Sequence, residues 1–585
     1  MKTRLLLIGL LANFAVISFA VDFPGAGGDL ADKDAWGGTL PSSSDGVTIV
    51  NGGTYTASDD LSFGSLAVAY DQVVFDFAKD GDHWLTLTAG GEACLALPAS
   101  ADTVTSFKGG VWDFSLGSPY LAPTTAAYGG RTAELSDGCV WTNATRVTIA
   151  RGAKNPNTTL SVREGARIFS QELFVGYTSG GNVLSITDGG KVVIDGASGS
   201  STFYLDNKTP AKGNAVVVSG IGSSLEVRKG SALVGQGDAG GRIEITDGAS
   251  AYFSNLMIGN TTSGLDAQLF VGNGATLEAK NMTARSVGGS CVVSNATMIL
   301  PEAFRVGGKY ADGYSNFTFR VLGKATPFPL TVPNGNDVFC GSSVGNVFEL
   351  GQGAIWRLED TAQLCYASDS VKQMNTVRIA DGARLIGTNT VNFGERKQAN
   401  SISNTLEIVD GGVVDIPELR LSGIGNRVVI DDGFLFCTNK YSVENQYLRF
   451  GYKHPKSTGE PMNGSLTIGG SAPRLLSTSV VQFMNESTLR YEIPQAGYAK
   501  DYCPVQSAKL LLESSCALEI AADDWARETG GKLKLAAVTR NDGFENDITN
   551  VIKSVSLPAD CRLYIEGKSL FLKCPRRSGL SIIVK

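Results

Sequence analysis

Short runs of alternating apolar and polar residues recur along the chain, and most end in the same kind of corner. Their pattern is apolar-x-apolar-x-x-Gly-small, and an apolar residue usually resumes two places after the small one. Alternation with a period of two predicts a half-buried strand, so each unit predicts a strand, a glycine corner and a second strand. The copies are VTIVNGG (47–53), VTIARGA (147–153), LSVREGA (160–166), LSITDGG (184–190), LEVRKGS (225–231), IEITDGA (243–249), LFVGNGA (269–275), FELGQGA (348–354), VRIADGA (377–383), LEIVDGG (406–412) and VVIDDGF (428–434), with degenerate forms at 291–297 and 466–472.

The spacing of the copies suits one turn of a coil. Copies that start at 348, 377, 406 and 428 are 29, 29 and 22 residues apart, and a shorter pattern such as LFVG (173–176) lies between many of them. A unit of this size cannot bury its apolar face alone, whereas stacked units share one continuous core. The sequence therefore predicts an all-β fold, a parallel β-helix solenoid. A β-propeller or a string of β-sandwiches explains the repeated corner less well, and only 8% of the residues are aromatic.

The residue before the corner glycine is polar in the copies but varies in charge. A residue selected for a turn has this property, because Asp and Asn tolerate a left-handed backbone and the following Gly supplies positive φ. An active site would keep one chemistry. The position is occupied by Asn51, Arg151, Glu164, Asp188, Lys229, Asp247, Asn273, Gln352, Asp381, Asp410 and Asp432.

Asp381, Asp410 and Asp432 allow one sharper interpretation. They fall in successive copies, so coils stacked in register would bring their carboxylates together, with a repulsion of about 1 to 3 kcal/mol. A calcium ion could relieve this repulsion. Solvation and the N–H groups of the turns are the alternative, and the calcium-binding nonapeptide repeat is absent from the sequence.

Composition supports a folded chain with many turns. The 585 residues include 71 Gly, yet 43% are hydrophobic, enough to bury a core instead of remaining disordered. The formal net charge is −7, and no Lys/Arg-rich run is present. These features argue against nucleic acid and against an anionic membrane surface as partners.

The first twenty residues, MKTRLLLIGLLANFAVISFA, have the features of a signal peptide. Lys2 and Arg4 precede an apolar stretch, and Ser18 and Ala20 are small residues at the positions that a signal peptidase reads. Cleavage would change the net charge from −7 to −9, since two positive charges leave. A retained membrane helix is the alternative. No later segment has eighteen uninterrupted apolar residues, so we expect a secreted or cell-surface protein without an integral membrane segment.

The stretch VVVSGIGSSLEVRKGSALVGQGDAGGRIEITDGASAYFSNLMIGN (216–260) resembles the autotransporter and PEP-CTERM-associated repeat of exported bacterial proteins. The resemblance covers roughly 45 to 475 in degenerate form. It implies a passenger-like β-helix with adhesion or cell-surface structure as its role. No translocator barrel and no PEP-CTERM anchor are recognisable at the C-terminus, so the resemblance leaves the route of attachment open.

The two ends differ in texture from the repeats, and four segments are expected: a signal peptide (1–20), an N-terminal cap and first coil (21–60), the β-helix repeats with loop insertions (61–484), and a C-terminal capping domain (485–585). Trp36 is expected to cover the first coil, the alternative being a platform for sugar stacking. Residues 517–538 predict strand, short helix and strand, and 562–574 predict a hairpin around Glu-Gly-Lys.

The ten cysteines are too sparse for a disulfide scaffold. Those in or beside apolar runs are expected to be buried thiols, namely Cys291, Cys340, Cys365 and Cys437. One or two bridges are expected among the cysteines of the last ninety residues, with the connectivity left open: Cys503, Cys516, Cys561 and Cys574.

Signals for catalysis are weak. GSSVG at 341–345 matches the nucleophile elbow at Ser343 without a following helix, and GQGDAG at 235–240 is followed by a predicted strand where a dinucleotide site needs a helix. Loop insertions could hold a site of scattered residues, although packing or solvation explains each as well. These candidates are Asp82, His83, Trp84, Trp112 and Asp113 in 61–130, and His454 in 452–463.

No residue is therefore assigned to catalysis, to a cofactor or to a metal, and we expect a structural, adhesive or glycan-binding role. A polysaccharide or another component of the cell envelope is the expected partner. A polysaccharide lyase or glycoside hydrolase on the same scaffold is the alternative, and an acid and a base clustered in one groove would favour it. The ligand and the oligomeric state do not follow from the sequence.

Overall fold

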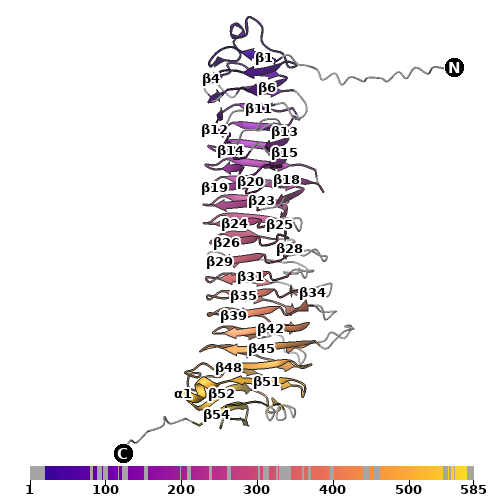
Figure 1. Ribbon diagram of the computed structural model, residues 1–585, viewed down its shortest axis with the longest axis vertical. Helices are drawn as coiled ribbons and strands as arrows, with labels where there is room; N and C mark the ends of the chain where they lie inside the picture. The colour runs from indigo at the N-terminus through magenta and orange to yellow at the C-terminus, as the bar shows by residue number, and fades with distance from the viewer. Residues whose placement is uncertain are drawn as a thin grey trace, which may run out of the picture.

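The computed structural model is a parallel β-helix in which 58% of the residues that the structure describes lie in strands, which confirms the predicted fold class. Figure 1 shows the coils stacked along the longest axis, with the first coils at one end of the rod and the last at the other. The structure describes residues 20–575 apart from 71, 79–82, 89–94, 97–102, 116, 122–129, 151–155, 198, 207–211, 236–239, 260–264, 301–302, 307–314, 324–326, 329–343, 359–361, 366–370, 395–400, 439–446, 453–461, 545–550, 552–554 and 559.

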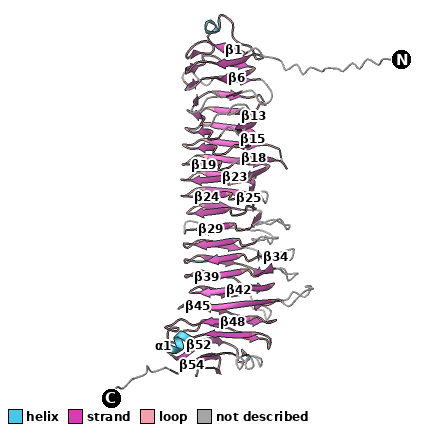
Figure 2. Cartoon of the chain, in the orientation of Figure 1, coloured by secondary structure: helices cyan, strands magenta, loops and turns pink. Residues whose placement is uncertain are grey.

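One long sheet runs along the whole rod, and each of its strands pairs in parallel with the strand of the next coil (Figure 2). Its main strands, in order along the rod, are β2 (Gly28–Asp29), β4 (Gly53–Thr56), β7 (Val73–Asp76), β10 (Val104–Lys108), β12 (Thr132–Ser136), β14 (Thr159–Val162), β16 (Val183–Ile186), β19 (Ala215–Ser219), β22 (Arg242–Thr246), β24 (Gln268–Gly272), β26 (Ser290–Ser294), β29 (Thr318–Leu322), β31 (Val347–Gly351), β35 (Thr376–Ile379), β39 (Thr405–Val409), β42 (Ile424–Asp431), β45 (Asn463–Gly469), β48 (Thr488–Glu492) and β51 (Ala517–Ala521); β34 (Val371–Lys372) and β38 (Ser401–Ile402) join it at the side.

The other faces of the coil are built from shorter sheets. In the first half of the rod these strands are β1 (Ala20–Phe23), β3 (Gly46–Ile49), β6 (Ser65–Val68) and β9 (Leu95–Ala96), and then a 13-stranded sheet of β5 (Leu61–Phe63), β8 (Trp84–Leu87), β11 (Val111–Asp113), β13 (Val140–Ile149), β15 (Arg167–Val175), β17 (Lys191–Asp195), β18 (Ser201–Leu205), β20 (Ser224–Lys229), β21 (Ser231–Val234), β23 (Ser250–Ile258), β25 (Thr276–Ala284), β27 (Thr297–Ile299) and β28 (Ala303–Val306).

Two separate sheets replace the 13-stranded sheet in the second half of the rod. The 10-stranded sheet holds β30 (Pro327–Phe328), β32 (Ile355–Leu358), β36 (Arg384–Gly387), β40 (Val413–Asp415), β43 (Phe434–Cys437), β46 (Arg474–Ser477), β49 (Val505–Ser507), β52 (Gly531–Val538), β53 (Arg562–Glu566) and β54 (Ser569–Cys574). The 6-stranded sheet holds β33 (Ala362–Leu364), β37 (Thr390–Phe393), β41 (Glu418–Leu421), β44 (Tyr447–Phe450), β47 (Val480–Phe483) and β50 (Lys509–Leu512).

The alternation seen in the sequence is the alternation of burial. In β16, Leu184 and Ile186 are fully buried while their neighbours are half-buried, and their partners in β14 are the buried Leu160 and Val162. The inward side chains of successive coils form one continuous hydrophobic cluster that extends from Phe23 to Cys574. Stacking therefore supplies the core that a single unit cannot make.

The predicted corners are confirmed in eight of the eleven copies. Their polar residue adopts a left-handed backbone, with φ between 49° and 56°, at Glu164, Asp188, Asp247, Asn273, Gln352, Asp381, Asp410 and Asp432. After Asp188, Gly189 has a φ of 78°, and a Cβ at Gly190 would lie 2.1 Å from the backbone oxygen of Val162 in the neighbouring coil. Close stacking therefore selects the small residue at this point.

Treating all eleven copies as equivalent is wrong for three of them. The copies at 47–53, 147–153 and 225–231 supply β3, the end of β13 and β20, which lie outside the long sheet. Asn51 and Lys229 accordingly lack the left-handed backbone, and Arg151 lies outside the described residues. Alternation alone cannot tell these faces apart, because every face of the coil is half-buried.

A column of buried amides, here called the asparagine column, lies where the strands of the long sheet begin. The Oδ1 of Asn375 accepts a hydrogen bond from the backbone N–H of Asn346 (2.9 Å), and the Oδ1 of Asn404 accepts one from Asn375 (3.0 Å). The Oδ1 of Asn426 continues the series on the backbone N–H of Asn404 (2.8 Å). All four residues are at most 1% exposed. These hydrogen bonds join one coil to the next inside the rod.

Different structures cover the two ends. Near the N-terminus, Trp36 donates its Nε1–H to the backbone oxygen of Leu30 (2.8 Å), and its ring packs against Phe23 and Phe63, as expected of a residue that covers the first coil. At the C-terminus, β51 leads into helix α1 (Asp523–Glu528) and β52. The hairpin β53–β54 then adds antiparallel to β52. Parallel stacking ends there, which protects the open edge of the solenoid.

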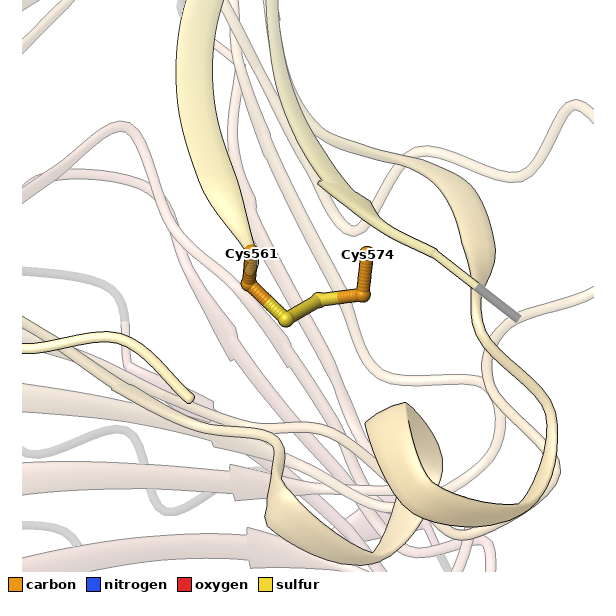
Figure 3. Close-up of a disulfide and its surroundings, with 2 residues drawn as sticks. All are labelled: Cys561 and Cys574. Atoms are coloured by element: carbon orange, nitrogen blue, oxygen red, sulfur yellow. A yellow bond between two sulfur atoms is a disulfide. The ribbon is translucent and has the colours of Figure 1, made fainter. Parts of the chain in front are cut away.

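The disulfide Cys561–Cys574, shown in Figure 3, closes the open end of the hairpin by joining the residue before β53 to the last residue of β54. The bridge settles the connectivity that the sequence leaves open, because Cys503 and Cys516 are free and buried. Cys291, Cys365 and Cys437 are buried thiols as predicted, and Cys340 lies outside the described residues.

Candidate functional site: a polar groove on the β-helix

A groove of about 510 Å³ opens on the outer side of the 13-stranded sheet, where the strands of each coil divide into two halves. In one coil the halves are the separate strands β20 and β21, joined through Gly230. Both pair with the single strand β23 of the next coil, one on either side of Ser254–Asn255. The groove follows this line of division from coil to coil. Its described lining residues are Gly199, Arg228, Lys229, Gly230, Ser231, Ser254, Asn255, Met257, Asn281, Thr283 and Arg305.

Gly230 is required at this division. Its φ is 78°, and a Cβ there would lie 2.4 Å from the backbone oxygen of Ser200 in the previous coil. The copy LEVRKGS at 225–231 therefore conserves the repeat pattern for a different reason than the long-sheet copies do: its glycine forms the bend that opens the groove.

Parallel register aligns like positions along the groove. Asn255 and Asn281 are partners on β23 and β25, and Met257, Thr283 and Arg305 stand in line on β23, β25 and β28. The Nδ2 of Asn255 donates to the Oγ of Ser231 (2.7 Å), which links it to the coil before. Coils stack at about 4.8 Å, so Asn255 and Asn281 stand side by side in one line, and Thr283 and Arg305 stand side by side in the other.

The groove is cationic, although the chain as a whole has a net charge of −7. Arg228, Lys229 and Arg305 line it, and none of its eleven described lining residues is Asp or Glu. Two of these cations have partners outside the lining: Arg228 pairs with Glu226 (2.8 Å) and Lys229 with Asp195 (2.9 Å). Arg305 is exposed and forms no ion pair with any residue that the structure describes. A ligand can therefore meet hydrogen-bond donors and positive charge here.

Elsewhere on the rod, charged side chains neutralise each other along the stacking direction. Arg320, Glu349, Arg378 and Glu407 are successive partners on the outer side of the long sheet. Arg320 contacts Glu349 at 2.8 Å, and Arg378 contacts Glu407 at 3.1 Å. Alternating signs favour this register, since like charges on adjacent strands would repel. These residues form a charge ladder and do not converge on a cleft.

The loop candidates that the structure describes do not converge on one cleft. Trp112 is 1% exposed and packs in the core against Phe77, with ring centroids 5.2 Å apart. Asp113 accepts hydrogen bonds from the backbone N–H of Ser115 (2.8 Å) and the Nδ2 of Asn143 (3.0 Å), so it holds a turn.

His83 and Trp84 lie in the coil next to Trp112 and Asp113, because β8 pairs with β11. His83 lies 3.8 Å from the carboxylate of Asp60, and Trp84 is 44% exposed at the start of β8. Asp82, Ser343 and His454 lie outside the described residues. After GQGDAG at 235–240 the chain forms the strand β22, as predicted from the sequence.

Two of the three corner aspartates considered for calcium, Asp410 and Asp432, have protein partners. Asp410 lies 3.5 Å from Arg378, and Asp432 accepts hydrogen bonds from the Oγ of Ser471 (3.1 Å) and the backbone N–H of Ala472 (2.7 Å). Burial raises the pKa of the adjacent Asp431, and the charges of Asp432, Asp410 and Glu492 add to the rise. Within the described ranges no group of three His, Cys, Asp or Glu side chains has a metal-binding arrangement.

Reasoning from the sequence missed the groove, although a signal for it exists. In AYFSNLMI (251–258) and LEAKNMTA (277–284), two apolar-x-apolar pairs are separated by a polar residue and an asparagine. This arrangement marks a coil face that divides into two half-strands.

Comparisons with protein families, with curated proteins and with solved structures return no match. The β-helix implied by the family resemblance is confirmed by the structure, and no family is assigned to the chain. In the part of the chain that the structure describes, no helix has the length and hydropathy to cross a bilayer. The Cys561–Cys574 bridge favours an oxidising compartment.

Proposed function

We propose that this chain is an exported, non-catalytic β-helix rod that binds a glycan or another component of a cell envelope, in a structural or adhesive role. The groove carries this proposal. Its lining combines amides, hydroxyls and guanidinium groups, as in Asn255, Thr283 and Arg305, and these groups suit the hydroxyl and ring oxygens of a sugar chain.

The same lining argues against glycan hydrolysis at this place. Most glycoside hydrolases need two carboxyl groups, one on each side of the scissile bond, and the described lining residues supply none. In the charge ladder of the long sheet, Arg320 is engaged with Glu349 and Arg378 with Glu407. The nineteen main strands described for the long sheet stack one per coil, so the rod spans roughly 85 to 90 Å at the usual strand spacing, which suits an element that presents a surface.

Export is the second part of the proposal. The first twenty residues have the features of a signal peptide, the disulfide suits an oxidising compartment, and the repeats resemble those of exported bacterial proteins. These three features agree with each other and would each be unexpected in a cytoplasmic protein.

The test is to pass the purified protein over a panel of immobilised plant, bacterial and host polysaccharides and to assay the flow-through for new reducing ends and unsaturated products. We expect retention on at least one polymer without products. Products that disappear when a single loop carboxylate is replaced would make the protein an enzyme. Failure to bind any polymer would remove the glycan-binding role.

A further inference from the structure

We propose that the groove binds an anionic polysaccharide, whose carboxylate or sulfate groups contact Arg305 while its sugar rings lie along the line of Asn255 and Asn281. This inference rests on the proposed glycan-binding function and specifies its ligand class. Charge complementarity is its first support, because three cations and no carboxylate are found among the described lining residues of a chain whose net charge is −7.

Arg305 is the side chain best placed to bind an anion. It is exposed at the end of the line Met257, Thr283 and Arg305, and no described residue forms an ion pair with it. Arg228 and Lys229 already have the partners Glu226 and Asp195, which offset most of their charge, so Arg305 carries the positive charge that an anion would meet. A guanidinium group suits carboxylate and sulfate alike, since it can donate two parallel hydrogen bonds to either.

The shape of the groove favours a polymer over a small ion. Residues from β20, β21, β23, β25 and β28 line it, so it crosses several successive coils at about 4.8 Å each. Met257, at the start of the line of Thr283 and Arg305, supplies an apolar surface on which a sugar ring can pack. A small anion would use only the Arg305 end.

The experiment is affinity electrophoresis of the purified protein in native gels that contain dextran sulfate, polygalacturonate or unmodified dextran. Retardation by a charged polymer, but not by dextran, is expected, and the more effective polymer identifies sulfate or carboxylate as the anion. Arg305→Gln should weaken binding about ten-fold, and Arg305→Lys should retain part of it. The matched control is Arg384→Gln, because Arg384 is an exposed arginine on β36, outside the groove.

The outcomes separate the failure of the anionic ligand from the failure of the proposed glycan binding. Equal weakening by Arg305→Gln and Arg384→Gln, or by neither, would overturn the assignment of the groove. Retardation by dextran that equals retardation by the charged polymers would overturn the anionic class, while the proposed glycan-binding function would stand. No retardation by any polymer, together with no retention on the polysaccharide panel, would overturn both. The variants' melting temperatures should match that of the unmodified protein, because Arg305 and Arg384 are exposed.

Discussion

Replacing Asn375 by leucine tests whether the asparagine column holds neighbouring coils together. Leucine has a similar volume and leaves no large cavity, but it removes the acceptor for the backbone N–H of Asn346 (2.9 Å) and for the Nδ2 of Asn346 (3.2 Å). Asn346 is 1% exposed, so water cannot readily replace the lost acceptor. A buried donor left without an acceptor costs about 1 to 3 kcal/mol. The amide of Asn346 should therefore exchange its hydrogen roughly 5- to 150-fold faster.

Hydrogen–deuterium exchange read by mass spectrometry measures this effect coil by coil. Peptides that cover 345–350 should lose protection in Asn375→Leu, whereas peptides from β13 and β15 should not, because each coil contacts only its neighbours. Asn541→Leu is the control, since Asn541 lies in an exposed turn and should change stability by no more than about 0.5 kcal/mol. Unchanged protection of Asn346 in a folded Asn375→Leu protein would refute a stabilising role for the column.

Four further predictions concern the ends, the core and the charges of the rod. Reduction of Cys561–Cys574, which closes a loop of sequence separation 13, should destabilise the C-terminal hairpin by about 3 kcal/mol. Limited proteolysis should then cut the hairpin while the coils resist. Equal resistance of the hairpin with and without reductant would contradict this prediction. Burial raises the pKa of Asp206 to about 7, so its folded-state pKa lies above its unfolded value and the native protein should lose stability as the pH rises from about 4 to about 7. The loss in the free energy of unfolding should be about 1.4 kcal/mol per unit of difference between the folded and unfolded pKa, and Asp206→Asn should remove it. Urea titrations at several pH values measure this free energy, and the same pH dependence in the variant would contradict the prediction. Arg378→Gln should cost less than about 1 kcal/mol, and Arg378→Glu more, with the difference shrinking at high salt; denaturation midpoints at two salt concentrations check this. Calcium or a chelator should leave the melting temperature unchanged, because Asp410 and Asp432 already have protein partners, and a rise with calcium concentration would indicate a bound ion.

The fold could be predicted because its cause is repeated many times. Alternation such as Leu184 and Ile186 inward, followed by Asp188 and Gly189 at the corner, recurs at intervals that match one coil, and the structure stacks these residues as expected. What the sequence could not assign was the face of each copy. LEVRKGS at 225–231 has the same alternation as its relatives on the long sheet, because every face of the coil has an apolar inner side.

The candidate site was less accessible to sequence reasoning for a physical reason. Asn255 and Arg305 are fifty residues apart and meet one groove only because parallel register brings their coils together. The asparagine column has a signal of the same kind, because Asn346, Asn375 and Asn404 each stand two residues before the first buried hydrophobic residue of a strand. A scan for polar residues at a fixed offset from each strand would have found it.

The most direct test of a binding rod without catalysis is size-exclusion chromatography with multi-angle light scattering, applied to a mixture of the protein and the polysaccharide that retards it most. Binding without turnover predicts that the protein elutes with the polymer and that the polymer's mass stays constant over a long incubation. A falling polymer mass would contradict this and identify the protein as a depolymerising enzyme.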